Sequence, residues 1–222
     1  MPRAEFDRDL RIVQDELLMM GSMVEKAIGR SLEALKNRDL LMAEEVVRDD
    51  DIIDDKQYEI EEKCIDLIAT QQPMAVDLRT LVTVMHLAGE LERMGDYAEG
   101  IAKISLMMGD EPPLKPLIDI PRMATMASDM LRRSLDAFVN RDVVSSMVVR
   151  NDDDEIDALY EQVYRELLTF MLGDPTVIRR ATYLLWAAHN IERIADRTTN
   201  IAENVIYMVT GERIDVVASP TS

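Results

Sequence analysis

The stretch Ser31-Leu-Glu-Ala-Leu-Lys-Asn-Arg-Asp39 decides the fold, because it returns as Ser134-Leu-Asp-Ala-Phe-Val-Asn-Arg-Asp142, an offset of 103 residues. Further along each half, Glu92-Arg-x-x-Asp96 is matched by Glu192-Arg-x-x-Asp196, an offset of 100 residues. Arrays of short helical repeats have units of roughly 34 to 47 residues, so a period of about 100 is too long for them. The sequence therefore predicts a duplicated domain.

Composition and apolar spacing predict that both halves are helical. Glycine, proline and aromatic residues are scarce, and apolar residues recur every three or four positions from Phe6 to Leu35. Helix-breaking signals at Pro73, Gly109 and Pro175 divide the rest of the chain. The expected helices are 6–36, 39–70, 75–108, 122–140, 142–172 and 175–211. Long helices with short connections fold back antiparallel, so the fold class is all-α, with two tandem three-helix bundles lying end to end or side by side.

Proline and glycine also set the expected domain limits. Residues 1–109 would form the first three-helix repeat and residues 122–212 the second. Between them, residues 110–121 hold four prolines and are expected to form a linker. Residues 213–222 follow the last helix and are expected to be a frayed tail.

Charge and cysteine content limit the partners and the compartment. The formal net charge is −18, so nucleic acid and anionic membrane surfaces would be repelled, whereas cations or a partner with a basic face would be attracted. The single cysteine, Cys64, falls at a helical core position and suits a reducing compartment. No stretch approaches about 18 uninterrupted apolar residues, so we expect a cytoplasmic protein without membrane insertion.

The matched acids lie beside the apolar face of the third helix in each half. At about 100° per residue, Glu92, Asp96 and Glu99 form one stripe that flanks the core. The second half places three acids on the same stripe: Glu192, Asp196 and Glu203. Carboxylates four residues apart repel each other unless a cation, an arginine or a proton intervenes. These stripes are therefore candidate cation sites.

A second pair of acids lies on the second helix of each half. If Val46 is aligned with Val148, an offset of 102 residues, Asp51 and Asp55 are matched by Asp153 and Asp157. Side-by-side packing of the second and third helices would then gather up to four carboxylates in each half. Oxygen ligands suit Mg, Mn, Ca or Fe(II), with Zn as a further possibility. The alternative is that the acids are only solvated and paired with neighbouring arginines.

Four stretches of the sequence carry a family resemblance: Leu91-Glu-Arg-Met-Gly-Asp96, Asn190-Ile-Glu-Arg-Ile-Ala-Asp-Arg-Thr-Thr-Asn-Ile-Ala-Glu203, Val209-Thr-Gly-Glu212 and the Pro-Met-Ala-Val-Asp-Leu-Arg79 segment. In these stretches the sequence resembles the PhoU family of bacterial phosphate-transport accessory regulators. It implies a non-enzymatic cytoplasmic regulator that links the ATPase subunit of a phosphate ABC transporter to a sensor histidine kinase. It also implies a homodimer and multinuclear metal sites that hold Fe, Zn, Mn or Mg.

The residues that correspond to the family's metal motifs are Asp51, Asp55, Glu92, Asp96, Asp153, Asp157, Glu192 and Asp196, with Glu99, Asn200 and Glu203 beside them. The two halves differ at the end of the third-helix motif. Where the second half has Asn200 and Glu203, the first has Gly100 and Lys103, which removes a ligand and adds a positive charge. The sequence therefore predicts tighter metal binding in the second half.

Two other functions remain open from the residues alone. A di-iron carboxylate enzyme would need Glu-x-x-His motifs, but neither His86 nor His189 lies three residues after a glutamate, and the two do not match each other in the repeat. No glycine-rich phosphate loop is present. A purely structural or interaction bundle is the other alternative, and metal analysis of the purified protein would separate it from a metal-binding regulator.

Overall fold

The structure, a computed structural model, describes residues 3–212 and is helical in both halves. The first half contains α1 (Arg3–Asn37), α2 (Leu40–Gln71) and α3 (Val76–Met108). The second half contains α4 (Asp119–Asn140), α5 (Val143–Asn151), α6 (Asp153–Gly173), the short 3₁₀ helix η1 (Pro175–Val177) and α7 (Ile178–Thr210). Residues 3–212 include no strand, which confirms the all-α class and the two three-helix bundles. The expected tail lies outside the described residues.

The repeated Asn-Arg-Asp sequence forms the same turn in both halves. Arg38 and Arg141 take φ values of 58° and 53°, and the aspartate that follows each arginine caps the next helix. Asp39 accepts a hydrogen bond from the backbone N–H of Met42, whereas Asp142 accepts from the two N–H groups of Val144 and Ser145. An aspartate at this position satisfies N–H groups that have no partner inside the helix. The stretch that reveals the duplication is thus a helix reversal.

The expected single helix over residues 142–172 is wrong, because the chain leaves the α-helix at Asp152 and divides into α5 and α6. Asn151 and the three aspartates that follow it are weak helix formers, since their side chains compete for backbone hydrogen bonds. At the break, the N–H of Glu155 donates to the carbonyl of Asp152 over 3.3 Å, a tighter turn than the α-helix makes. The break places Asp153 at the start of α6.

Helix α4 begins at Asp119, three residues before the expected start at Arg122. Pro121 lies in its first turn, where a missing N–H costs no intrahelical hydrogen bond. The connection before it, residues 109–118, is anchored to both halves. Arg38 donates to the carbonyl of Asp110 over 3.4 Å, and Lys115 pairs with Glu166 of α6.

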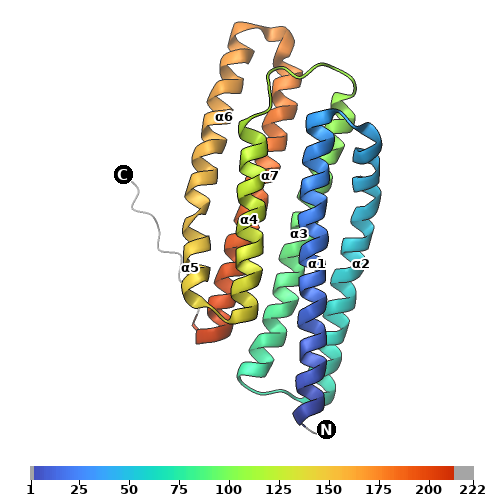
Figure 1. The fold of residues 1–222 in the computed structure, drawn as a ribbon, viewed down its shortest axis with the longest axis vertical. Coiled ribbons are helices and arrows are strands. Elements are labelled where there is room, and N and C mark those ends of the chain that lie inside the picture. Colours follow the sequence, from blue (N-terminus) through green and yellow to red (C-terminus); the bar gives the residue numbers. More distant parts are fainter. Residues whose placement is uncertain (1–2, 213–222) are drawn as a thin grey trace.

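The two bundles lie side by side rather than end to end. Helices α3 and α7 pack against each other, and α1 lies beside α4 on one side of them (Figure 1). Helix α2 flanks α3 at one edge, and α5 and α6 flank α7 at the other. One hydrophobic core runs through both halves and includes Leu91 of α3 and Ile191 of α7, both fully buried. The third helix of each repeat is therefore central, with its acids at the boundary between core and solvent.

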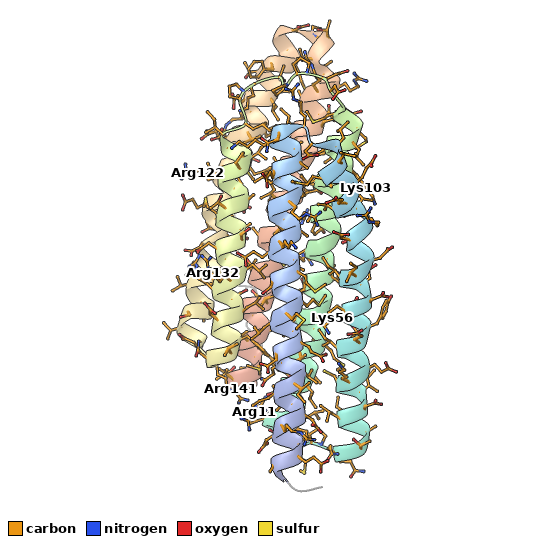
Figure 2. All side chains as sticks on the ribbon, turned by 45° about the vertical axis from the view of Figure 1, so that its right-hand side comes forward. Arg11, Lys56, Lys103, Arg122, Arg132 and Arg141 are labelled. Atoms are coloured by element: carbon orange, nitrogen blue, oxygen red, sulfur yellow. The ribbon has the colours of Figure 1, made fainter. Side chains whose placement is uncertain are left out.

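Basic side chains are spread over the surface of both bundles. Figure 2 labels Arg11, Lys56 and Lys103 on the first bundle and Arg122, Arg132 and Arg141 on the second, at different heights along the helices. None of the helices within residues 3–212 is long and apolar enough to cross a membrane.

Candidate metal centre

The buried positions of the second helix fix the register between the two halves at 103 residues. The buried residues of α2 include Val46, Ile53 and Ile60, and the residues 103 positions later are buried as well: Val149, Ile156 and Val163. The alignment of Val46 with Val148, which gave an offset of 102 residues, is therefore wrong by one residue. A duplicated ion pair gives the same offset. Arg30 Nη1 lies 2.7 Å from Asp49 Oδ2, and Arg133 Nη1 lies 2.6 Å from Asp152 Oδ2. The true equivalents of Asp153 and Asp157 are therefore Asp50 and Asp54.

The first acidic cluster lies between α2 and α3 and consists of Asp50, Asp54, Glu92, Asp96 and Glu99. Carboxylate oxygens of Asp50, Asp96 and Glu99 lie within 4.8 Å of one another, and so do those of Asp54, Glu92 and Asp96. Asp96 belongs to both groups and joins them. Lys103 Nζ binds Glu99 Oε2 over 2.5 Å, at one end of the cluster. Among residues 3–212, both groups of three close carboxylates belong to the first half.

The first acidic cluster holds more carboxylates than the nearby positive groups can neutralise. Burial, followed by the charges of Glu99, Asp54 and Asp96, raises the pKa of Asp50 to about 7. Burial also raises the pKa values of Asp54, Glu92 and Asp96, and neighbouring acids raise them further. Asp54 Oδ1 is buried and accepts no hydrogen bond from a described residue. An unsatisfied carboxylate oxygen among other carboxylates fits a hard divalent cation such as Mg²⁺, Mn²⁺ or Fe²⁺.

The second acidic cluster occupies the equivalent place between α6 and α7 and consists of Asp153, Asp157, Glu192 and Asp196. Burial and then the charges of Asp157, Asp196 and Glu192 raise the pKa of Asp153 to about 7. Asp153 Oδ1 is buried without a hydrogen bond from a described residue, as Asp54 Oδ1 is in the first cluster. The donor set again suits a hard cation.

An arginine and a histidine already lie on the second acidic cluster. Arg193 Nη1 is 2.9 Å from Asp196 Oδ2, and Arg193 Nε is 3.6 Å from Glu192 Oε2. His189 Nδ1 lies 3.3 Å from the same Glu192 oxygen, and its ring packs against Tyr160. A cation would have to compete with this arginine.

The extra residues expected to strengthen the second site are engaged elsewhere. Glu203 Oε1 accepts a hydrogen bond from Arg150 Nε over 2.9 Å, and Asn200 donates to Glu90 of α3 over 3.0 Å. Glu99 is also paired with a basic residue, Lys103, but it still lies inside the first acidic cluster. The geometry thus favours the first half, opposite to the order that the sequence predicts.

Seven of the eleven predicted site residues are brought together; Asn200 and Glu203 are engaged elsewhere, and Asp51 and Asp55 lie outside both clusters. Glu92, Asp96 and Glu99 lie in the first acidic cluster, and Asp153, Asp157, Glu192 and Asp196 form the second. Asp51 and Asp55 are exposed on α2, away from α3, and the unpredicted Asp50 and Asp54 take their places. The seven-residue spacing of Val46, Ile53 and Ile60 would have identified the correct pair, since Asp50 and Asp54 flank that buried stripe.

Comparisons with known proteins agree with the duplication. The family model described as PhoU domain matches twice, at residues 17–105 and 120–205. The phosphate-specific transport system accessory protein PhoU homolog of Clostridium acetobutylicum is 42% identical, over 97% of this chain and 99% of that protein. The homolog of Aquifex aeolicus is 40% identical, over 92% and 93%.

Two solved structures share the fold. The crystal structure of PhoU from Pseudomonas aeruginosa superposes with a TM-score of 0.89 at 33% identity, covering 93% of this chain and all of that one. The phosphate transport system regulatory protein PhoU from Streptococcus pneumoniae gives a TM-score of 0.88 at 30% identity, covering 95% and 100%. With both repeats matched and the helices superposed over nearly the full length, the chain belongs to the PhoU family.

Proposed function

We propose that this chain is a cytoplasmic, non-enzymatic regulator that restrains phosphate-starvation signalling by linking the ATPase subunit of a phosphate ABC transporter to a sensor histidine kinase. The observation that carries the proposal is the pair of acidic clusters at equivalent places in the two halves of a PhoU-family chain. Support for the transport role comes from the curated relatives, which are named as accessory proteins of the phosphate-specific transport system.

The acidic clusters would bind divalent cations. Asp50, Asp54, Glu92 and Asp96 would hold the ion in the first half, with Glu99 beside them. A bound cation would offset the repulsion between the carboxylates and tie α2 to α3. Loss of metal on the double substitution Glu92→Ala with Asp96→Ala, measured by elemental analysis of protein purified without chelators, would support this role. Metal content equal to that of the wild type would remove the site.

A genetic experiment tests the regulatory role. Deleting the gene should raise expression from a phosphate-starvation promoter during growth in high phosphate, and the wild-type gene should restore repression. The variant Glu92→Ala with Asp96→Ala should restore it less completely, whereas the control Asp51→Asn with Asp55→Asn, which changes exposed acids of α2, should restore it fully. Unchanged promoter activity in the deletion strain would contradict the proposal.

Binding assays test the two partners separately. The purified chain should bind the ATPase subunit and the cytoplasmic part of the kinase, and the binding should weaken with salt because the chain carries a net charge of −18. If the chain binds the ATPase subunit but not the kinase, the proposed role would be limited to the transporter. Light scattering on the free chain would test the expected homodimer.

An iron enzyme is the second candidate, and the acidic clusters are the observation that favours it. Di-iron oxidases built on helical bundles use histidine as well as carboxylate ligands. Here His86 is exposed, and His189 contacts Glu192 from the edge of the second acidic cluster. We therefore expect no oxygen consumption above the rate of free Fe²⁺ when the protein is loaded with Fe²⁺. A faster rate, lost in Glu92→Ala with Asp96→Ala, would favour the enzyme instead.

A further inference from the structure

The two acidic clusters differ most in where the arginine of the Glu-Arg-x-x-Asp motif lies. In the second half, Arg193 contacts both motif acids, Glu192 and Asp196. In the first half, the equivalent Arg93 turns away and donates to Glu90 over 3.3 Å. No ion pair within residues 3–212 joins Arg93 to the motif acids of its own half. Because the motif is the same in both halves, the cause lies in the neighbouring residues.

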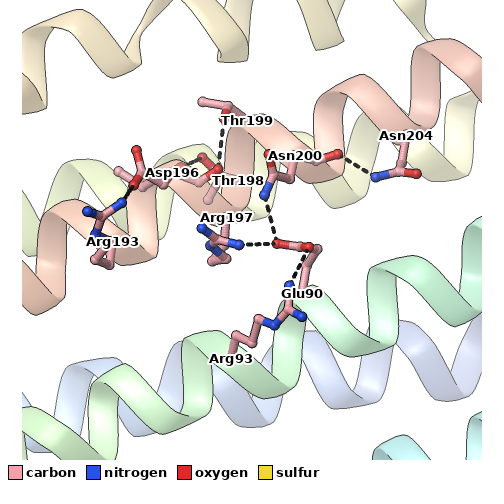
Figure 3. A network of polar contacts seen from close by, with 10 residues as sticks. Glu90, Arg93, Arg193, Asp196, Arg197, Thr198, Thr199, Asn200 and Asn204 are labelled. Atoms are coloured by element: carbon pink, nitrogen blue, oxygen red, sulfur yellow. Dashed lines mark hydrogen bonds and ion pairs between the residues drawn. The ribbon is translucent and has the colours of Figure 1, made fainter. Parts of the chain in front are cut away.

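Glu90 collects three donors at the boundary between α3 and α7 (Figure 3). One carboxylate oxygen accepts from Arg93, and the other accepts from Arg197 over 3.3 Å and from Asn200 over 3.0 Å. The Glu90 side chain is only 13% exposed, so its charge is weakly screened. It lies between two guanidinium groups that would repel each other without it.

The equivalent place in the second half has no acid. Asn190 replaces glutamate there, and it faces Gly100, where an added Cβ would lie 2.8 Å from Asn190 Nδ2. Tyr97 stands where Arg197 stands in the other half, and it lies close enough to Arg193 to affect its pKa. Within residues 3–212, no ion pair joins Arg193 to a carboxylate of α3. The repeats therefore differ at three positions that contact one another between α3 and α7. These are Glu90 and Asn190, Tyr97 and Arg197, and Gly100 and Asn200.

We propose that Glu90 and Asn190 determine which acidic cluster is open to a cation. Glu90 is a positioning residue: it binds Arg93 and so keeps this arginine from forming ion pairs with Glu92 and Asp96. Asn190 does not hold Arg193, which therefore occupies the second acidic cluster in place of a cation. Since Glu90 also accepts from Arg197 and Asn200 of α7, cation access in the first half is linked to the contact between the two bundles. This inference rests on the cation binding proposed above.

Titration of the metal-free full chain with Mn²⁺ tests the inference, with one cluster disabled at a time. When Glu192→Ala and Asp196→Ala disable the second cluster, adding Glu90→Gln should weaken Mn²⁺ binding by about tenfold, the low end of the effect of residues that orient ligands. The control Glu33→Gln removes an equal charge from an exposed position of α1 and should change little.

The reverse substitution gives the opposite prediction. When Glu92→Ala and Asp96→Ala disable the first cluster, Asn190→Glu should strengthen binding by about tenfold, because the new carboxylate would draw Arg193 off the second cluster. Crystal structures of the metal-free variants provide a readout that needs no cation. They should show Arg93 on the first cluster in Glu90→Gln and Arg193 against residue 190 in Asn190→Glu.

Mn²⁺ affinities within twofold of their backgrounds, with both arginines unmoved, would overturn the inference and leave the proposed cation binding intact. Arginines that move without changing the affinity would also overturn it, because their position would then not control access. If neither the wild type nor any variant binds Mn²⁺, the proposed cation binding fails, and the inference fails with it.

Discussion

Asp153 occupies in the second half the place that Asp50 occupies in the first, 103 residues earlier in the chain. Burial raises the pKa of each to about 7, and in both cases the neighbouring acids of the same cluster add to the effect. The settings differ in one respect: Asp50 lies within the continuous helix α2, whereas Asp153 begins α6 after the break at Asp152. Both clusters therefore have an aspartate at this position, although the local helix geometry differs between the two halves.

The register of α2 can be tested with two neighbouring aspartates. Asp50→Asn should weaken Mn²⁺ binding by about tenfold or more, since it removes a charged oxygen ligand, and tenfold corresponds to about 1.4 kcal/mol. Asp51→Asn should leave the affinity unchanged, because Asp51 is exposed and lies outside the first acidic cluster. Isothermal titration calorimetry on both variants makes the comparison. A larger effect at Asp51 would restore the register first predicted from the sequence.

The stability of the metal-free protein should fall as the pH rises. Burial raises the pKa of Asp50 and of Asp153 from the ordinary 3.8 to about 7, so their contribution to stability is fully present below about pH 4 and is lost as the pH rises through 7. Urea unfolding between about pH 5 and 8 should therefore show a decreasing free energy of unfolding.

Two matched double variants test whether Asp50 and Asp153 cause this dependence of the free energy of unfolding on pH. Asp50→Asn with Asp153→Asn should flatten it, because neither asparagine has to be charged in a buried place. Asp51→Asn with Asp154→Asn, which changes the exposed neighbours, should keep the wild-type slope. Equal slopes in the two double variants would show that the pH dependence comes from other groups.

Close packing of α1 against α4 predicts opposite effects for two glycines of α1. A Cβ added at Gly21 would collide with Cδ1 of Leu135, whereas one added at Gly29 would meet nothing within 4 Å. Overpacking costs about 1 to 3 kcal/mol, and alanine gains about 1 kcal/mol over glycine in a helix. Gly21→Ala should therefore lower the free energy of unfolding by about 1 kcal/mol, and Gly29→Ala should raise it by up to about 1 kcal/mol. Chemical denaturation measures both, and a stabilised Gly21→Ala would show that Leu135 moves freely.

Cys64 should be inert in the folded protein. It is fully buried in α2, and burial raises the pKa of its thiol to about 12, so the reactive thiolate is scarce. Alkylation by iodoacetamide should be much slower than for a free thiol and should reach the rate of the free thiol in denaturant. Mass spectrometry of timed samples gives the rate, and rapid labelling without denaturant would indicate local opening of α2.

Local sequence was sufficient for the helices but not for every boundary. The Asn-Arg-Asp repeats, the break at Pro73 and the apolar spacing of α1 act over a few residues, and the structure follows them. The sequence does not indicate the break at Asp152, because the apolar pattern of Val149 and Ile156 continues across it. A single tight turn changes the hydrogen bonding without moving those side chains out of the core.

For the candidate site too, the sequence identifies some residues more readily than others. Glu92 and Asp96 could be identified from the sequence because the motif occurs twice and lies beside a buried stripe. Their partners on α2 are harder to identify, since a run of aspartates looks alike in either register, and only the apolar stripe of Val46, Ile53 and Ile60 distinguishes Asp50 and Asp54 from their neighbours.

The sequence by itself determined that this chain is a duplicated all-helical protein with an acidic motif in the third helix of each half. These properties depend on periodicity and on capping residues, which act locally. Only the tertiary structure decided that the bundles lie side by side and that Arg93 and Arg193 lie in different places. Those outcomes depend on contacts such as Glu90 with Arg197, between residues more than 100 positions apart, and no local pattern encodes them.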